Sequence, residues 1–261
     1  MRRRHTYGTT GCRLHLDVRA HFPADATLFD DDPKVFPGAG SRRTRAAMMG
    51  DIVHCDADQV ELAIEVASPA PIERIEVRNG TGVVALLRPY GREALGSRLR
   101  VIWSGAEYRG RGRQSSWTGR ARFGGVPIRA IRKINAWNLE RRLEQTTSDT
   151  VEFDAITTGN FGGFDAWLDE DSVKGGEFQF VCNHGTLRAP MDEIGLDDHV
   201  LDCGGLARQV RVFRLPETNP HREMRERISV PLHTDGDNPL WVCVTTEDGF
   251  QAWSSPIFVY R

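Results

Sequence analysis

Long apolar runs are missing from this sequence. No stretch approaches the roughly 18 consecutive apolar residues of a membrane-spanning helix, and no apolar segment follows the positively charged N-terminus as in a signal peptide. We therefore expect a cytoplasmic protein with no membrane partner. An excess of one charge is also missing, because 34 Lys and Arg residues nearly balance 36 Asp and Glu residues. The net charge of −2 gives no global attraction to nucleic acid or to a membrane surface.

Paired metal-ligand motifs are missing too. The five cysteines never form a C-x-x-C pair, which argues against a zinc ribbon or a disulfide framework. We expect Cys12, Cys182 and Cys243, which fall in strand-like runs, to be buried free thiols. Of the eight dispersed histidines, His15 comes nearest to a metal ligand, because it shares a strand face with Asp17. The solvent-facing side of a half-buried strand is the simpler interpretation of these two residues.

Active-site loop signatures are not present either. The sequence contains no G-x-S-x-G nucleophile elbow, no Walker A loop and no G-x-G-x-x-G fingerprint. The acidic segment 192–202 offers the oxygen ligands that calcium favours, but its spacing does not match an EF-hand loop. We interpret it as a solvated surface loop, and we assign no catalytic residue and no cofactor to this chain.

Alternation of apolar and polar residues dominates what is present. Residues 13–19 place Leu14, Leu16 and Val18 on one side and charged or polar residues on the other, as in a half-buried strand. Turn signals such as Asn79-Gly80 separate the runs. About a dozen short strands predict an all-β fold, either one mostly antiparallel β-sandwich or two packed sandwiches with long loops. The further strands are expected at 59–67, 72–78, 83–88, 98–104, 126–134, 151–156, 177–182, 208–214, 227–232, 240–246 and 256–260.

Segments without alternation define the rest of the organisation. Residues 135–145 contain the only helical pattern, with apolar side chains near one face. Residues 22–50 are rich in Pro, Gly and Asp, and we expect them, like residues 184–207, to form long loops. We interpret 1–261 as a single β-rich region, with a sub-boundary at 108–125 as the alternative, because glycine and arginine interrupt the strand pattern there.

Arginine is concentrated between residues 109 and 142, with tryptophan and phenylalanine interleaved. Arginine beside aromatic side chains can hold phosphates and stack on bases. The same arginines can instead pair with the acid-rich segments 148–171 and 192–202. We favour that pairing and expect no nucleic-acid partner, with nucleic-acid binding through 109–142 kept as a weaker alternative. The inter-domain or ligand-contact candidates of this segment are Arg109, Arg111, Arg113 and Trp117.

Five motifs, in this order along the chain, carry a family resemblance. The chain resembles the C-terminal portion of a bacterial family of unknown function that is allied to the PHP (polymerase and histidinol phosphatase) metallohydrolases. The first and last motifs are the most specific. The motifs are "RHTYGTTGCR" at 4–13, "MGD" at 49–51, "IERIEVRNG" at 72–80, "VIWSGAEYRGRGR" at 101–113 and "EDGFQAWSSPIFV" at 247–259.

The resemblance implies that a PHP-like catalytic domain belongs before this region. In such a family that domain supplies the His and Asp ligands of a divalent metal cluster, and this sequence has no counterpart of those ligand motifs. We therefore expect the catalytic domain in cis or as a separate chain, and we interpret the sequence as a truncated or split gene product. The residues expected to face that domain are Arg4, His5, Tyr7, Thr9 and Thr10.

The functional hypothesis follows from the resemblance. It describes a non-catalytic accessory or interaction region of a PHP-like metal-dependent hydrolase, in which metal chemistry belongs to the other domain. The alternative is a stand-alone metal-dependent phosphoesterase, or a ligand-binding β-sandwich with a site of its own. The sequence does not identify a substrate.

Overall fold

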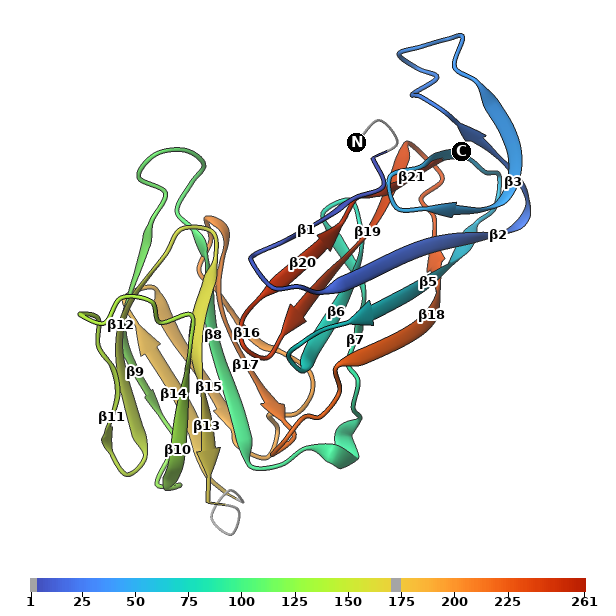
Figure 1. The fold of residues 1–261 in the computed structure, drawn as a ribbon. Helices are drawn as coiled ribbons and strands as arrows, with labels where there is room; N and C mark the ends of the chain where they lie inside the picture. The colour runs from blue at the N-terminus through green and yellow to red at the C-terminus, as the bar shows by residue number, and fades with distance from the viewer. Residues whose placement is uncertain (1–3, 170–174) are drawn as a thin grey trace. The chain divides into compact units, whose positions relative to one another are not determined.

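β-strands make up almost all of the regular structure. The computed structural model describes residues 4–169 and 175–261, and these residues form an all-β fold of mostly antiparallel sheets, as predicted (Figure 1). Within the described ranges the only helix is the short 3-10 helix η1 (Arg92–Ala94). No helix in this part of the chain is long and apolar enough to cross a membrane.

The chain divides into two compact units. Unit 1 combines Met1–Pro89 with Pro220–Arg261, and unit 2 is Tyr90–Asn219. The segment 108–125, where a sub-boundary was considered, therefore lies inside unit 2. Its residues 109–113 form the exposed loop before strand β9 (Ser115–Arg122), and its other glycines and arginines lie in β9 and in the turn that follows, so the segment is not a linker between units.

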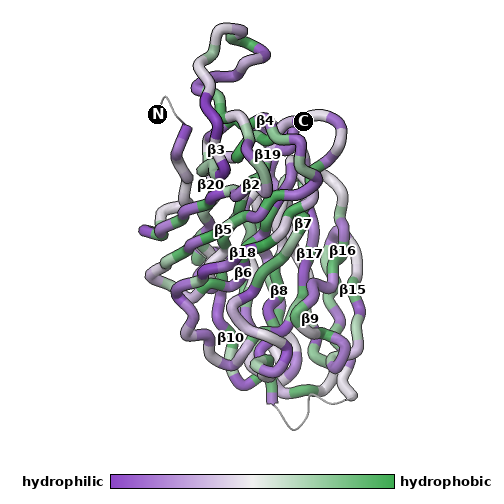
Figure 2. The backbone as a smooth tube through the Cα atoms, turned by 90° about the vertical axis from the view of Figure 1, so that its right-hand side faces the viewer, coloured by the Kyte–Doolittle hydropathy of each residue, from purple (hydrophilic) through white to green (hydrophobic). Residues whose placement is uncertain are grey.

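Unit 1 contains one large sheet that encloses its own core. Alternate side chains of strands from both parts of the unit, such as Leu16, Ile64, Val77 and Val242, form a single buried cluster. Figure 2 shows the alternation of hydrophobic and hydrophilic residues along β5 and β18. The strands are β1 (Tyr7–Thr9), β2 (His15–Phe29), β3 (Ser41–Met48), β4 (Ile52–His54), β5 (Gln59–Ala67), β6 (Ile72–Asn79), β7 (Gly82–Leu87), β18 (Glu223–Pro231), β19 (Asp237–Thr246), β20 (Gln251–Ser254) and β21 (Ile257–Tyr260).

The C-terminal strands close this sheet. β19 pairs with β20 near its end and with β21 near its start. β21 also pairs in parallel with β4, and β20 pairs with β1. The first and last segments of the chain are therefore held in the same sheet.

Unit 2 is a β-sandwich of two five-stranded sheets. One sheet has the order β10-β13-β8-β17-β16 and the other β11-β12-β9-β14-β15. Aromatic side chains fill its core, and Trp103 stacks on Phe153 with ring centroids 4.7 Å apart. The remaining strands are β8 (Arg98–Ala106), β10 (Ile128–Ile134), β11 (Leu143–Thr147), β12 (Thr150–Thr157), β13 (Phe161–Leu168), β14 (Glu177–Cys182), β15 (Gly185–Pro190), β16 (His199–Asp202) and β17 (Leu206–Leu215).

The helical pattern at 135–145 was wrong. Residues 135–142 form a loop, and β11 begins at Leu143. Asn135 has a φ of 51°, outside the right-handed helical region. Trp137 and Leu139 are 74% and 97% exposed, so a helix here would have no apolar stripe to bury.

The two long loops expected at 22–50 and 184–207 are also wrong in part. β2 continues to Phe29 and pairs with β3, and the second segment contains β15 and β16. Most residues of β3 are exposed, so backbone hydrogen bonds hold this strand without a clear apolar alternation. The sequence pattern that identifies half-buried strands is therefore missing there.

Candidate functional site

The N-terminal segment is anchored in unit 1 by strand pairing. β1 lies against β20, with Tyr7 opposite Ser254 and Thr9 opposite Ala252. At the end of the strand, the Thr10 amide donates to the Gln251 carbonyl oxygen (3.0 Å), and the Thr10 hydroxyl accepts from the Gln251 amide (2.9 Å). Tyr7 is 39% exposed. The predicted contact residues Thr9 and Thr10 thus stabilise a sheet edge in this unit.

Arg4 and His5 contact the turn between β3 and β4. Arg4 Nε donates to the Gly50 carbonyl oxygen (3.0 Å), and His5 Nε2 lies 2.7 Å from Asp51 Oδ1. The other carboxylate oxygen of Asp51 accepts from the Met48 amide (2.9 Å), so the turn itself fixes the carboxylate. Gly50 has a φ of 97°, and a Cβ there would lie 2.3 Å from the Arg4 carbonyl oxygen. Only glycine allows this close approach.

The C-terminal motif completes the same cluster. The Thr6 and Ser255 hydroxyls are 3.0 Å apart, and the Ser255 amide donates to the Thr6 carbonyl oxygen (2.9 Å). The Gly50 amide donates to the Pro256 carbonyl oxygen (2.9 Å). Three motifs that are far apart in the sequence, at 4–13, 49–51 and 247–259, therefore meet in unit 1. We call the group Arg4, His5, Thr6, Gly50, Asp51 and Ser255 the N-terminal cluster.

A polar groove borders the N-terminal cluster. Its volume is about 550 Å³, and its charged lining balances acidic and basic side chains. Arg42 lies 3.5 Å from Asp30, and Arg4 lies 3.9 Å from Asp31. His5 and Asp51 are 26% and 13% exposed, so their hydrogen-bonded pair is reachable from the groove. We call the groove lined by Arg4, His5, Asp30, Asp31, Arg42 and Asp51 the charged groove.

The candidate metal ligands do not converge. His15 is exposed and Asp17 half-buried on the outer face of β2, and Asp17 accepts from Arg19 Nε at 2.8 Å. Among the described residues, no group of three or more His, Cys, Asp or Glu side chains could hold a metal ion. In the acidic segment, Asp197 forms an ion pair with Arg92 and Asp198 forms one with Arg211, so these two carboxylates bind arginine side chains.

All five cysteines are free thiols. Cys243 is buried, as predicted, whereas Cys12 and Cys182 are only half-buried. Cys12 precedes β2, and Cys182 is the last residue of β14, so both occupy positions where a strand meets a turn. Burial raises the pKa of both half-buried thiols.

In the described part of the chain, the arginine-rich segment pairs with acids of 148–171 and with Glu144. Arg141 lies 2.6 Å from Asp154, and Arg142 lies 2.6 Å from both Glu144 and Glu152. The acids of 148–171 therefore supply partners, as expected, whereas the partners found for Asp197 and Asp198 lie outside 109–142. These ion pairs join neighbouring strands and loops of unit 2.

The contact candidates of that segment separate into two groups. Arg109, Arg111 and Arg113 lie exposed in the loop before β9. Trp117 is fully buried in the core of unit 2, where its Nε1 donates to the Thr157 hydroxyl at 2.9 Å. Because the Trp117 ring is inaccessible, its place is in packing rather than in an exposed contact surface.

Sequence reasoning missed a buried charge cluster on β8 and β13. Asp165 is fully buried and accepts from Arg98 (2.7 Å), Arg100 (2.7 Å) and Arg132 (2.7 Å). Burial opposes ionisation, but the guanidinium groups of Arg100, Arg98 and Arg132 together hold the pKa of Asp165 below its ordinary value. In the strand expected at 98–104, Arg98 and Arg100 alternate with apolar residues, as solvent-facing side chains of a half-buried strand do. The signal that could have identified the cluster is the single carboxylate of Asp165 inside the apolar strand β13.

Comparison with known proteins adds no relative. No protein-family model, no curated protein and no solved structure matches this chain. The resemblance to the PHP-allied family therefore stays a prediction based on motifs, and the site is defined by its own geometry.

Proposed function

We propose that this chain is a non-catalytic accessory region that docks a PHP-like metal-dependent hydrolase domain through the charged groove of unit 1. The observation that carries the proposal is the convergence of three motif segments at the N-terminal cluster. Those segments are the ones whose sequence resembles the PHP-allied family. The partner domain is in cis or a separate chain, and it supplies the divalent metal and the reacting groups.

Charge supports a polypeptide partner for this groove. Asp30, Asp31 and Asp51 alternate with basic groups over the groove, and a surface with both signs of charge favours a partner with a complementary pattern. The His5–Asp51 pair is fixed on one side by the Met48 amide, so it presents a defined shape without reorganisation. Such preorganisation favours docking over loose electrostatic attraction.

The test co-expresses the full chain with the PHP-like protein encoded nearest to it. Light scattering after size-exclusion chromatography measures the complex, and hydrolysis of an aryl phosphate with Mn²⁺ measures activity. We expect a stable complex, and phosphoesterase activity that requires the partner. Hydrolysis by this chain alone would establish the stand-alone enzyme instead, and failure to form a complex would refute the docking proposal.

Two variants locate the contact. His5→Ala is expected to weaken the complex at least tenfold, because it leaves the Asp51 carboxylate without its imidazole partner at the groove. Asp25→Ala removes the exposed pair with Arg45 (2.8 Å) in the same unit and should leave affinity unchanged. The melting temperature of each variant separates a docking defect from unfolding. Equal affinity of His5→Ala and the unmodified chain would place the interface elsewhere.

A further inference from the structure

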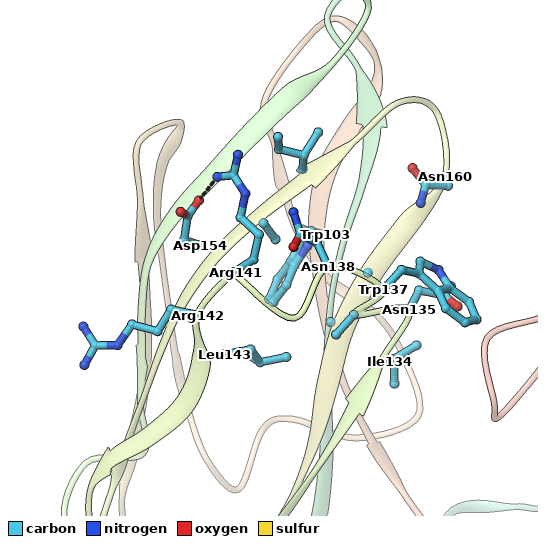
Figure 3. Close-up of a pocket in the computed structure, with 15 residues that line it drawn as sticks. Trp103, Ile134, Asn135, Trp137, Asn138, Arg141, Arg142, Leu143, Asp154 and Asn160 are labelled. Atoms are coloured by element: carbon cyan, nitrogen blue, oxygen red, sulfur yellow. Dashed lines mark hydrogen bonds and ion pairs between the residues drawn. The ribbon is translucent and has the colours of Figure 1, made fainter.

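A second site lies in unit 2, separate from the charged groove. A pocket of about 150 Å³ opens where the loop 135–142 joins β10 to β11, the edge strands of the two sheets (Figure 3). The loop, β8, β12 and β13 supply the lining. The open edge of a β-sandwich is thus covered by a loop that leaves a hollow beneath it.

The floor of the pocket contains a buried donor without a partner. Trp103 is 2% exposed, and its Nε1 has no hydrogen-bond partner in the part of the chain that the structure describes. Stacking on Phe153 fixes the ring, and a Cβ at Gly162 would lie 3.1 Å from this nitrogen. Buried N–H groups in native proteins are almost always paired with protein, water or ligand. The Trp103 N–H is therefore an unsatisfied donor directly beneath the lining of the pocket.

The mouth of the pocket combines an exposed ring with amide groups. Trp137 is 74% exposed although it is large and apolar. The side-chain oxygens of Asn138 and Asn160 accept from the Glu140 and Thr158 amides (2.9 and 2.8 Å). These bonds hold both side chains in place, and their NH₂ groups have no partner among the described residues. Figure 3 shows Trp103 and Asn138 side by side, with the Trp137 ring apart from them at the outer side of the loop.

Charge at the pocket argues against a phosphate ligand. The lining contains Arg141 and Arg142, but Asp154 neutralises the first at 2.6 Å. Glu144 and Glu152, each 2.6 Å away, surround the second. An anion would have to displace these carboxylates, whereas a neutral ligand leaves the pairs intact.

We propose that this pocket binds a neutral, polyhydroxylated six-membered ring, such as a hexose residue of a glycoside. A cavity of about 150 Å³ accommodates a ring of the size of benzene, so the sugar ring lies in the pocket and its outer hydroxyls extend through the mouth. The apolar C–H face of the sugar lies on Trp137, and the Trp103 N–H donates to a sugar oxygen. Asn138 and Asn160 donate to hydroxyl oxygens. Polar groups that are left unpaired without the ligand give the site its selectivity for hydroxylated rings.

The experiment uses the full chain and the methyl glycosides of glucose, galactose and mannose as probes. Saturation-transfer NMR and tryptophan fluorescence measure binding. We expect at least one glycoside to bind with a dissociation constant of about 1 mM. The corresponding hexose phosphate should bind more weakly, because Asp154, Glu144 and Glu152 repel it.

Three variants tie the binding to this pocket. Trp137→Ala removes an exposed ring and should weaken binding at least tenfold. Trp103→Phe keeps the aromatic packing but removes the N–H, and should weaken binding about fivefold. Leu139→Ala, at a 97% exposed position of the same loop that does not line the pocket, should change binding less than twofold. Near-ultraviolet circular dichroism verifies the fold of each variant.

Three results would overturn the proposal. The first is the absence of saturation transfer from all three glycosides at tens of millimolar. The others are tighter binding of the hexose phosphate than of the methyl glycosides, and tighter binding of a flat aromatic probe such as phenol than of the methyl glycosides. Equal binding by Trp137→Ala would place the sugar elsewhere. Because Trp137 lies in unit 2, loss of docking by the charged groove leaves this result unaffected.

Discussion

The buried Asp165 cluster gives the most direct test of what holds unit 2 together. Asp165→Asn keeps the size of the side chain and removes its charge. Oδ2 accepts from Arg98, Arg100 and Arg132, at 2.7, 3.0 and 2.7 Å. An amide nitrogen at that position would direct its hydrogens at three guanidinium donors. The substitution therefore removes an acceptor, adds a donor and leaves the buried Arg98 and Arg100 without their shared counter-charge.

The expected loss of stability is large for one substitution. Breaking a buried ion pair by removing one partner costs about 3–5 kcal/mol, because the remaining charge stays desolvated. Unit 2 spans roughly 130 residues, so its unfolding entropy at the midpoint is about 0.27 kcal/mol/K. The melting temperature of unit 2 should therefore fall by about 11–18 °C if the unit unfolds on its own.

Differential scanning calorimetry at neutral pH measures this change, and Asp154→Asn is the matched control. The pair Asp154–Arg141 has the same chemistry and lies in the same unit, but its side chains are 39% and 36% exposed. Removal of that charge should cost less than about 1 kcal/mol, because water and salt screen the pair. If both variants lower the melting temperature by the same few degrees, burial does not control the contribution of Asp165, and the reasoning fails.

Three further predictions follow from single contacts. Gly50→Ala should destabilise unit 1 by more than about 1–2 kcal/mol in urea unfolding, because Gly50 has a positive φ and a Cβ would strike the Arg4 carbonyl. Hydrogen bonds from Gly125, Thr150 and neighbouring donors outweigh partial burial and lower the pKa of Asp149 to about 2. The ionised carboxylate therefore stabilises the fold fully above about pH 4, and this stabilisation declines as the pH falls towards 2. The free energy of unfolding of Asp149→Asn should lack this part of the pH dependence, and the same pH profile for both proteins would contradict the prediction. Burial raises the pKa of Cys203 to about 11, so iodoacetamide should modify it at pH 8 far more slowly than a free cysteine.

Sequence alternation predicted most of the strands because their alternate side chains face a core. β5 (Gln59–Ala67) and β14 (Glu177–Cys182) match the expected runs residue for residue. β3 and β11 escaped prediction because most of their residues are exposed and each strand buries only one side chain, Ala47 and Leu143. A pattern of burial cannot reveal a strand that buries little.

The sequence pattern did not predict the division into two units, and the reason is the topology of the chain. Unit 2 is inserted between β7 and β18, so unit 1 is built from both ends of the chain. A composition shift marks a linker, but the chain leaves and re-enters unit 1 at Pro89 and Pro220 without a long polar segment. The pairing of β5 with β18 is what joins the distant parts, and local sequence patterns do not contain that register.

The two candidate sites also differ in how far they can be predicted from the sequence, because local patterns do not show which distant residues meet. Arg4 and His5 stood out because charged residues crowd one short motif, but their partners Gly50 and Asp51 are found only once β3 and β4 bring their turn to the N-terminal segment. Trp103 gave no such signal, since a tryptophan in an apolar strand is ordinary core. Its importance depends on an N–H left unpaired under a loop, which is a property of the packed structure.

The two proposed sites can be tested independently because each belongs to its own folding core. The cluster around His5 rests on the sheet of unit 1, whereas Trp103 and Trp137 belong to the sandwich of unit 2, and each unit has a separate apolar cluster. Substitutions without shared partners usually act additively. The variant His5→Ala/Trp137→Ala should therefore lose docking and glycoside binding by the factors found for the single variants. A larger loss of glycoside binding in the double variant than in Trp137→Ala would show that the docking groove and the pocket are coupled, and that one function controls the other.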